Sequence, residues 1–132
     1  MREILFRGKR ENGEWIYGLP YECDGTIDCI RVKESIENII AYISYKVIPE
    51  TVGQYTGLTD KNGKKIFEGD IVRISERGKV VNGKIIFKNA YNGGWLVADK
   101  TEQSSCSLAM RNNVEVIGNI HDNPELMEEG AE

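Results

Sequence analysis

The chain has 132 residues, which is enough for one domain or for two very small sub-domains that share a core. Its hydrophobic fraction of 40% and charged fraction of 29% are ordinary for a globular protein and exclude disorder as the default state. The net charge of −4 is uneven, because residues 122–132 carry five acidic and no basic residues, whereas the remainder has 17 basic and 16 acidic residues. The charge therefore neither indicates nor excludes binding to nucleic acid.

The first third of the chain has the pattern of antiparallel hairpins. A strand is expected over residues 3–7, followed by a tight turn at Asn12-Gly13, since Asn-Gly readily takes the positive φ that such turns need. Residues 14–18 are rich in aromatic and β-branched side chains and form the returning strand. A second hairpin around Asp24-Gly25 is expected to pair the end of that strand with residues 26–32.

Residues 34–43 interrupt this pattern. Ile36, Ile39, Ile40 and Ile43 recur at the spacing of one face of an amphipathic helix, which predicts a short helix here. The same four isoleucines also argue against a helix, because β-branched residues are mediocre helix formers. A strand is expected over residues 45–48, ending at Pro49.

The C-terminal part predicts a small β-barrel. After an Asn62-Gly63 turn, strands are expected over residues 71–74, 79–81, 84–87, 95–98 and 114–120. The Asn82-Gly83 turn is expected to join the second of these strands to the third, and the turn at 92–94 to precede the fourth. Five short strands with tight turns are typical of an SH3-like barrel.

The predicted fold is therefore mainly β. Residues 1–58 form an N-terminal subdomain of antiparallel hairpins with one short helix, and residues 59–121 form the SH3-like barrel. Residues 122–132 form an acidic tail that is expected to fray, although Pro124 stands at the first position of a final helical turn.

The three cysteines predict no metal site. Cys23, Cys29 and Cys106 are odd in number, and their spacing matches neither a disulfide framework nor a zinc motif. A four-ligand zinc site would need all three together with His121, the one histidine of the chain. We expect reduced, mostly buried thiols instead.

Catalytic signals are weak. Asp60, Glu68 and Asp70 are close enough in sequence for acid–base or metal chemistry, but Asp60 begins a turn and the other two flank a glycine at the start of a strand. The Ser104–Ser107 segment has no glycines of a nucleophile elbow around it. The sequence therefore predicts no enzyme, no catalytic residues and no cofactor.

Basic loops and aromatic residues are the candidate binding residues. Gly8-Lys9-Arg10 and Gly63-Lys64-Lys65 lack phosphate-loop spacing but suit contacts with a nucleic-acid backbone. Exposed aromatic side chains would complete such a surface, although most aromatics of a small β protein belong to the core. The candidate residues are Lys9, Arg10, Trp15, Tyr55, Lys64 and Lys65.

Three blocks of the sequence resemble a known family. They are Phe6-Arg7-Gly8-Lys9-Arg10 with residues 12–18, the long central block of residues 47–72, and Val116-Ile117-Gly118-Asn119-Ile120-His121-Asp122-Asn123-Pro124-Glu125-Leu126. In this order they are similar to the YopX family of bacteriophage and prophage proteins. The resemblance implies an SH3-like barrel in the C-terminal part and an origin in a phage or prophage. It implies no established activity, cofactor or catalytic residue.

These observations favour a binding protein over an enzyme. The apolar runs are far shorter than the roughly 20 residues that cross a membrane, and residues 1–7 lack the apolar region of a secretory signal, so we expect no membrane partner and a location in the cytoplasm of the bacterial host. We expect a phage accessory protein that binds a macromolecule without catalysis or assembles with itself, with a homo-oligomer and a host or phage protein as partners. A small barrel that binds nucleic acid is the alternative.

Overall fold

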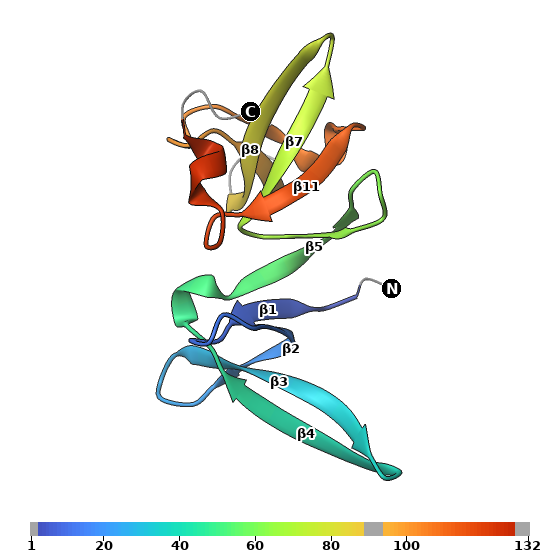
Figure 1. Cartoon of the computed structure of the whole chain (residues 1–132), viewed down its shortest axis with the longest axis vertical. Helices are drawn as coiled ribbons and strands as arrows, with labels where there is room; N and C mark the ends of the chain where they lie inside the picture. The colour runs from blue at the N-terminus through green and yellow to red at the C-terminus, as the bar shows by residue number, and fades with distance from the viewer. Residues whose placement is uncertain (1–2, 89–93, 129–132) are drawn as a thin grey trace. The chain divides into compact units, whose positions relative to one another are not determined.

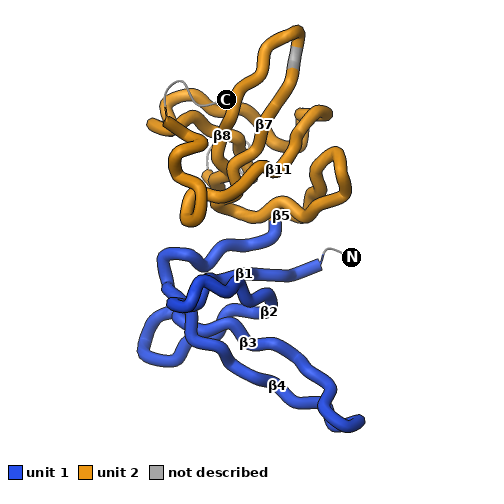
Figure 2. The backbone as a smooth tube through the Cα atoms, viewed as in Figure 1, with its two compact units in different colours: residues 1–55 blue, residues 56–132 orange. Residues whose placement is uncertain are grey.

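The chain is built mainly from β-strands in two antiparallel sheets, which confirms the predicted fold class at this level (Figure 1). The computed structural model describes residues 3–88 and 94–128. The chain divides into two compact units, residues 1–55 (unit 1) and residues 56–132 (unit 2), as Figure 2 shows. The division falls inside strand β5 (Gly53–Thr59), as does the boundary predicted after residue 58.

The first sheet has the strand order β4-β3-β2-β1-β5-β6. Besides β5, its strands are β1 (Phe6–Lys9), β2 (Trp15–Glu22), β3 (Ile27–Ile36), β4 (Ile39–Lys46) and β6 (Lys65–Phe67). A short 3-10 helix, η1 (Pro49–Thr51), separates β4 from β5. Strand β4 forms one edge of the sheet, and the turn between β1 and β2 contains the predicted Asn12-Gly13.

One face of β1 to β4 carries the core of unit 1. Ile16, Ile30 and Val47 are buried there. Because side chains alternate along a strand, the neighbours of these residues in sequence point to the opposite face of the sheet. That opposite face contains several exposed aromatic side chains.

The helix predicted over residues 34–43 is wrong. The segment is the end of β3, a two-residue turn at Glu37-Asn38, and most of β4, with φ of 49° and 69° at the two turn residues. Ile36 lies directly opposite Ile39 in the hairpin. The helical spacing of the isoleucines thus comes from two strands folded onto one another, and β-branched side chains favour that arrangement.

The second sheet lies in unit 2 and has the strand order β10-β9-β8-β7-β11. Its strands are β7 (Asp70–Glu76), β8 (Lys79–Lys88), β9 (Gly94–Ala98), β10 (Ser105–Ser107) and β11 (Val114–Asn119). The core of unit 2 contains Ile66, Val72, Ile74, Ile85, Val97, Leu108 and Val114. The sheet is antiparallel, whereas its closure into an SH3-like barrel stays a prediction.

The turn predicted at Asn82-Gly83 is also wrong. Both residues lie inside β8, and the turn that joins β7 to β8 is at Arg77-Gly78, with φ of 51° and 77°. Glycine is needed at 83 for another reason, because a Cβ atom there would lie 2.4 Å from Cγ1 of Val97 on the neighbouring strand. The predicted turn at 92–94 falls largely on residues 89–93, outside the described residues.

Part of the acidic tail is packed on unit 2. Pro124 begins the 3-10 helix η3 (Pro124–Met127), which confirms the predicted helical turn, and the Asn82 side chain donates a hydrogen bond to the Leu126 carbonyl. Lys100 forms an ion pair with Glu128 at 2.7 Å. A further 3-10 helix, η2 (Leu108–Met110), precedes β11. No helix in the part of the chain that the structure describes is both long and apolar enough to span a membrane.

Candidate functional site

The register of unit 1 gathers aromatic and basic side chains on the face of the sheet opposite the core. Leu19 pairs with Arg31, and Lys33 pairs with Tyr42. Directly opposite residues of antiparallel strands lie on the same face, as do residues two apart in one strand. We call the resulting surface the aromatic-basic face. It consists of Tyr17, Leu19 and Tyr21 of β2, Arg31 and Lys33 of β3, and Tyr42 of β4.

The aromatic-basic face is open, and acidic groups are absent from it except at one end. Its four uncharged members are between 41% and 64% exposed. Among the described residues of β2, β3 and β4, the one Asp or Glu at a position on this face is Glu22, which pairs with Ile27 beyond the β-bulge after Tyr21. Glu34 of β3 points to the opposite face, where its carboxylate accepts a hydrogen bond from the hydroxyl of Tyr45 and raises the pKa of that hydroxyl.

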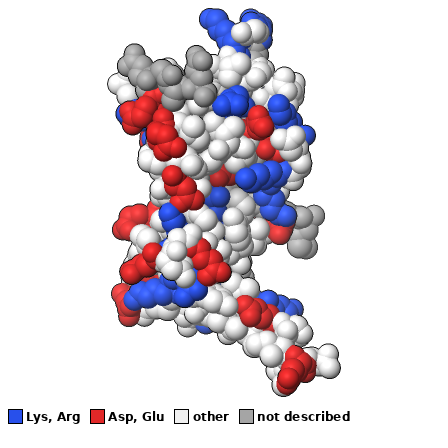
Figure 3. Space-filling model, in the orientation of Figure 1, with Lys and Arg blue, Asp and Glu red and all other residues white. Residues whose placement is uncertain are grey.

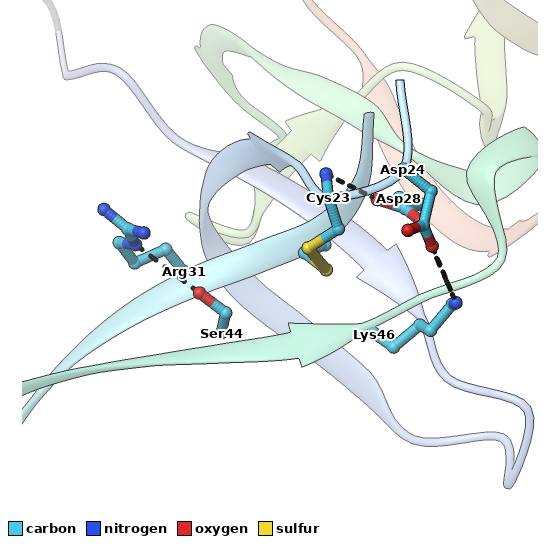
Figure 4. Close-up of a disulfide and its surroundings, with 7 residues drawn as sticks. Cys23, Asp24, Asp28, Arg31, Ser44 and Lys46 are labelled. Carbon is cyan, nitrogen blue, oxygen red and sulfur yellow. Dashed lines mark hydrogen bonds and ion pairs between the residues drawn. A yellow bond between two sulfur atoms is a disulfide. The ribbon is translucent and has the colours of Figure 1, made fainter. Parts of the chain in front are cut away.

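The guanidinium of Arg31 lies over an aromatic ring of this face. Its Cζ atom is 3.8 Å from the centroid of the Tyr21 ring. Its Nε donates a hydrogen bond to the hydroxyl of Ser44 at 3.5 Å, as Figure 4 shows. This stacking orients the guanidinium and leaves further N–H donors for a ligand. Lys33 is exposed and forms no ion pair or side-chain hydrogen bond with another described residue. The two cations therefore remain available to an anion.

A groove runs beside the two cations. It has a volume of about 450 Å³, and its walls are mostly apolar. It is lined by Ile4, Leu5, Gly18, Leu19, Arg31, Lys33 and Tyr42. A mostly apolar groove with a few polar groups is the usual form of a ligand site in a protein. The groove shares four residues with the aromatic-basic face, so the two form one surface.

The residues predicted to bind are distributed over both units. Lys9 and Trp15 are paired across β1 and β2 in unit 1, and Arg10 forms an ion pair with Glu14 at 2.9 Å. Tyr55 is 8% exposed and belongs to the interior. The remaining two candidates, Lys64 and Lys65, lie in unit 2, at the end of the turn that leads into β6. None of these six residues is among those that define the aromatic-basic face, but Lys9 and Trp15 lie on the same side of the sheet, because Trp15 is two residues from Tyr17 in β2.

The carboxylates considered for catalysis hold the backbone in place. One Asp60 oxygen accepts bonds from the backbone N–H groups of Asn62 and Lys64, and the other accepts the N–H of Val116 at 2.9 Å. Burial raises the pKa of the Asp60 carboxyl, but these three donors together with the Lys64 charge bring it below the ordinary value. Asp70 likewise accepts the backbone N–H of Phe67 at 2.7 Å.

The expectation of three reduced thiols is wrong for two of the cysteines. Cys23 and Cys29 form a disulfide across the β2–β3 turn (Figure 4). Cys106 is free. With the Asp28 carboxylate, the two sulfur atoms are the one group of potential metal ligands found among the described residues. In the disulfide form these sulfurs have no thiolate to offer a metal ion.

Sequence reasoning missed the most prominent members of the site. Tyr21, Arg31, Lys33 and Tyr42 were not identified, and the helix predicted over 34–43 removed β4, and with it Tyr42, from the sheet. The sequence of β2 did contain a signal for an exposed apolar face. Every second residue of this strand is large, and the residues between them include the buried Ile16. The large residues are Trp15, Tyr17, Leu19 and Tyr21. A strand that is apolar on both faces has either two buried faces or one face that binds a partner.

A comparison with models of known protein families shows to which family the chain belongs. The model of the family described as YopX protein matches residues 5–128, nearly the whole chain. The chain belongs to the YopX protein family. The YopX resemblance of the three sequence blocks is thereby confirmed.

A solved structure shows the same fold as this YopX-family chain. It is the crystal structure of protein EF1440 from Enterococcus faecalis, with a TM-score of 0.64 and 22% sequence identity, covering 97% of this chain and 100% of that one. At this identity the likeness shows the fold alone. Among curated proteins, no relative matches the chain.

Proposed function

We propose that this YopX-family protein is a non-catalytic module that binds single-stranded nucleic acid on its aromatic-basic face. The observation that carries the proposal is the combination of three exposed tyrosines, Tyr17, Tyr21 and Tyr42, with Arg31 and Lys33 on one face. The nucleic-acid alternative drawn from the sequence thus becomes the favoured function, on a different set of residues. Its setting is that of a phage or prophage accessory protein, as the family resemblance implies.

The composition of the face matches the two parts of a nucleotide. Aromatic side chains stack on bases of any sequence, and cations neutralise the phosphates that connect them. The rings of Tyr17 and Tyr21 are four residues apart on β2, a rise of about 13 Å along an extended strand. Arg31 and Lys33 lie on the neighbouring strand between β2 and β4. A strand of nucleic acid crossing the face therefore meets rings on both sides of a cationic row.

A single strand fits this surface better than a duplex. Bases in a duplex are stacked on one another, so that flat rings on a sheet cannot reach their faces, whereas unpaired bases can be splayed onto aromatic side chains. Duplex recognition commonly places a helix or a two-stranded ribbon in a groove. The aromatic-basic face is instead a sheet surface with an apolar groove.

The experiment is a binding titration with two charge-matched double variants. Fluorescence anisotropy is measured with a labelled oligothymidylate, and competition with unlabelled RNA and duplex DNA follows. Arg31→Glu with Lys33→Glu changes the proposed site. Lys64→Glu with Lys65→Glu changes the net charge by the same amount in unit 2, at residues that the sequence suggested. Any general effect of charge must therefore be equal in the two variants.

We expect the oligothymidylate to bind, with affinity that falls steeply with salt. The Arg31/Lys33 variant should lose about tenfold or more in affinity, which corresponds to about 1.4 kcal/mol, while the Lys64/Lys65 variant stays near the unchanged protein. Equal losses in the two variants, or a larger loss at Lys64 and Lys65, would contradict the proposed surface. No binding at low salt would contradict the function and favour a protein partner.

A further inference from the structure

Strand β4 is an unusually apolar sheet edge. It is eight residues long, and among the described residues no strand pairs with its outer side. It has no proline, and its one charged residue, Lys46, stands at its end. Ile39, Ile40 and Tyr42 are 67%, 58% and 64% exposed. Proteins usually protect such edges with charges, prolines, bulges or a covering segment, so an edge left like this is suited to pairing with another strand.

The hairpin register shows which backbone N–H and C=O groups of β4 form no hydrogen bond with β3. The two-residue turn makes Ile36 and Ile39 a hydrogen-bonded pair, and such pairs alternate along an antiparallel ladder. The odd-numbered residues of β4 therefore bond to β3. The N–H and C=O groups of Ile40, Tyr42 and Ser44 point outward, away from β3.

We propose that β4 pairs with β4 of a second copy of this chain, antiparallel and about a two-fold axis at Tyr42. Each even-numbered residue then meets an even-numbered residue, so that outward backbone groups face one another on both strands. Tyr42 lies opposite Tyr42 of the second copy, and Ile40 lies opposite Ser44. On the other face, Ile39 lies opposite Tyr45 and Ala41 opposite Ile43. The exposed isoleucines of each strand are covered by the other.

The charges of the hairpin favour a second copy in this direction. Each β4 has its cation, Lys46, at one end and the Glu37-Asn38 turn just beyond the other end. Figure 3 shows acidic side chains at the free end of the hairpin. Antiparallel pairing about Tyr42 puts Lys46 opposite Asn38 of the second copy and next to its Glu37. A parallel arrangement would instead place like charges together. Lys46 also contacts Asp24 of its own chain at 3.3 Å.

Pairing of this kind would extend the surface described above. A two-fold axis perpendicular to the sheet keeps the same face of both copies on the same side. The two aromatic-basic faces then join across β4 into one continuous platform. This consequence rests on the proposed function, whereas the pairing itself does not.

The test is the mass of the protein in solution, measured without nucleic acid by sedimentation equilibrium over the micromolar range. Ile40→Pro removes one outward N–H group and leaves the β3 ladder intact, since proline is tolerated on edge strands with this orientation. Ile40→Lys places a charge at the same position. Met110→Lys makes the same change at a residue of unit 2 that is 77% exposed, and serves as the control. Circular dichroism checks that each variant folds.

We expect a dimer for the unchanged protein and for Met110→Lys, and dissociation constants at least about tenfold higher for Ile40→Pro and Ile40→Lys. A monomer throughout the micromolar range overturns the proposal. A dimer that persists unchanged in both folded Ile40 variants overturns it as well, because the contact would then lie elsewhere. If Ile40→Pro does not fold, Ile40→Lys decides. Nucleic-acid binding is measured separately, so a failure of the proposed function leaves this result unaffected.

Discussion

The guanidinium of Arg31 lies 3.8 Å from the centroid of the Tyr21 ring, on the exposed face of the sheet that also contains Lys33 and Tyr42. The contact joins neighbouring strands and presents a positive charge and an aromatic ring side by side. Stacked arginine keeps its donors directed outward, so it can bind a phosphate without first leaving an ion pair. We regard this pair as the centre of the proposed nucleic-acid surface.

Removing a ring from the surface should weaken binding without preventing it. We expect Tyr42→Ala to lower the affinity for oligothymidylate by about 1–3 kcal/mol, the range measured for one base stacked on one aromatic residue. Tyr42→Phe keeps the ring and should bind nearly as the unchanged protein does. Anisotropy titrations at one salt concentration compare the three proteins. An equal loss in both variants would indicate a role for the hydroxyl and not for stacking.

Removing one cation should change the salt dependence. We expect Lys33→Ala to reduce the slope of log K against log salt by about 0.7, the contribution of one phosphate contact on a single strand. Lys79→Ala removes an exposed lysine of unit 2 and should leave the slope unchanged. Titrations at several salt concentrations give both slopes. Parallel lines for the unchanged protein and Lys33→Ala would show that this lysine does not contact a phosphate.

Asp60 should contribute to stability through its backbone donors. An amide at this position can accept the N–H groups of Asn62 and Lys64, but its NH₂ would then face the N–H of Val116. We expect Asp60→Asn to lower the free energy of unfolding by about 1–3 kcal/mol. Glu125→Gln makes the same chemical change at an exposed position and should have little effect. Urea denaturation measures both; a neutral Asp60→Asn variant would contradict the assigned role.

The same carboxylate should make stability depend on pH. The pKa of Asp60 is lower in the folded protein than in an unfolded chain, where it is about 3.9. Its contribution is therefore complete above pH 4 and decreases as the pH falls further towards the folded pKa. We expect the difference in unfolding free energy between the unchanged protein and Asp60→Asn to shrink below pH 4. A difference that stays constant down to pH 2 would rule out this linkage.

Reduction of the Cys23–Cys29 disulfide should destabilise unit 1. The bond closes a short loop, with a sequence separation of 6, and the chain-entropy relation gives about 2 kcal/mol for a loop of this size. We expect dithiothreitol to lower the melting temperature of the oxidised protein. Cys106→Ser leaves the disulfide intact and should respond to reduction in the same way. An unchanged melting temperature after complete reduction would show that the bond adds no stability.

Local turn chemistry was the most predictable part of the fold. The Asn12-Gly13 and Asn62-Gly63 turns were predicted because these residue types carry the required backbone conformation themselves. Asn82-Gly83 is the same dipeptide but lies within β8, where the side chain of Val97 leaves no room for a Cβ atom at residue 83. A glycine required by contact with a neighbouring strand cannot be distinguished from a turn glycine by the local sequence.

The candidate site was less predictable, for a related reason. Arg31 and Tyr42 belong to one surface only because the register of β2, β3 and β4 brings them there, and that register depends on the hairpin at Glu37-Asn38. Those turn residues are less typical than Asn-Gly, and the isoleucines around them imitate helical spacing. Basic loops such as Lys64-Lys65 are visible in a sequence, whereas a sheet face is visible only after its pairing is known.

The most direct test of the nucleic-acid surface is photochemical cross-linking. An oligonucleotide containing iododeoxyuridine is bound to the unchanged protein and irradiated, and the cross-linked peptides are identified by mass spectrometry. Our account predicts cross-links at Tyr17, Tyr21 or Tyr42, which are lost when Arg31 and Lys33 are changed to glutamate. Cross-links confined to residues of unit 2, or cross-links on unit 1 that persist in the variant, would contradict it.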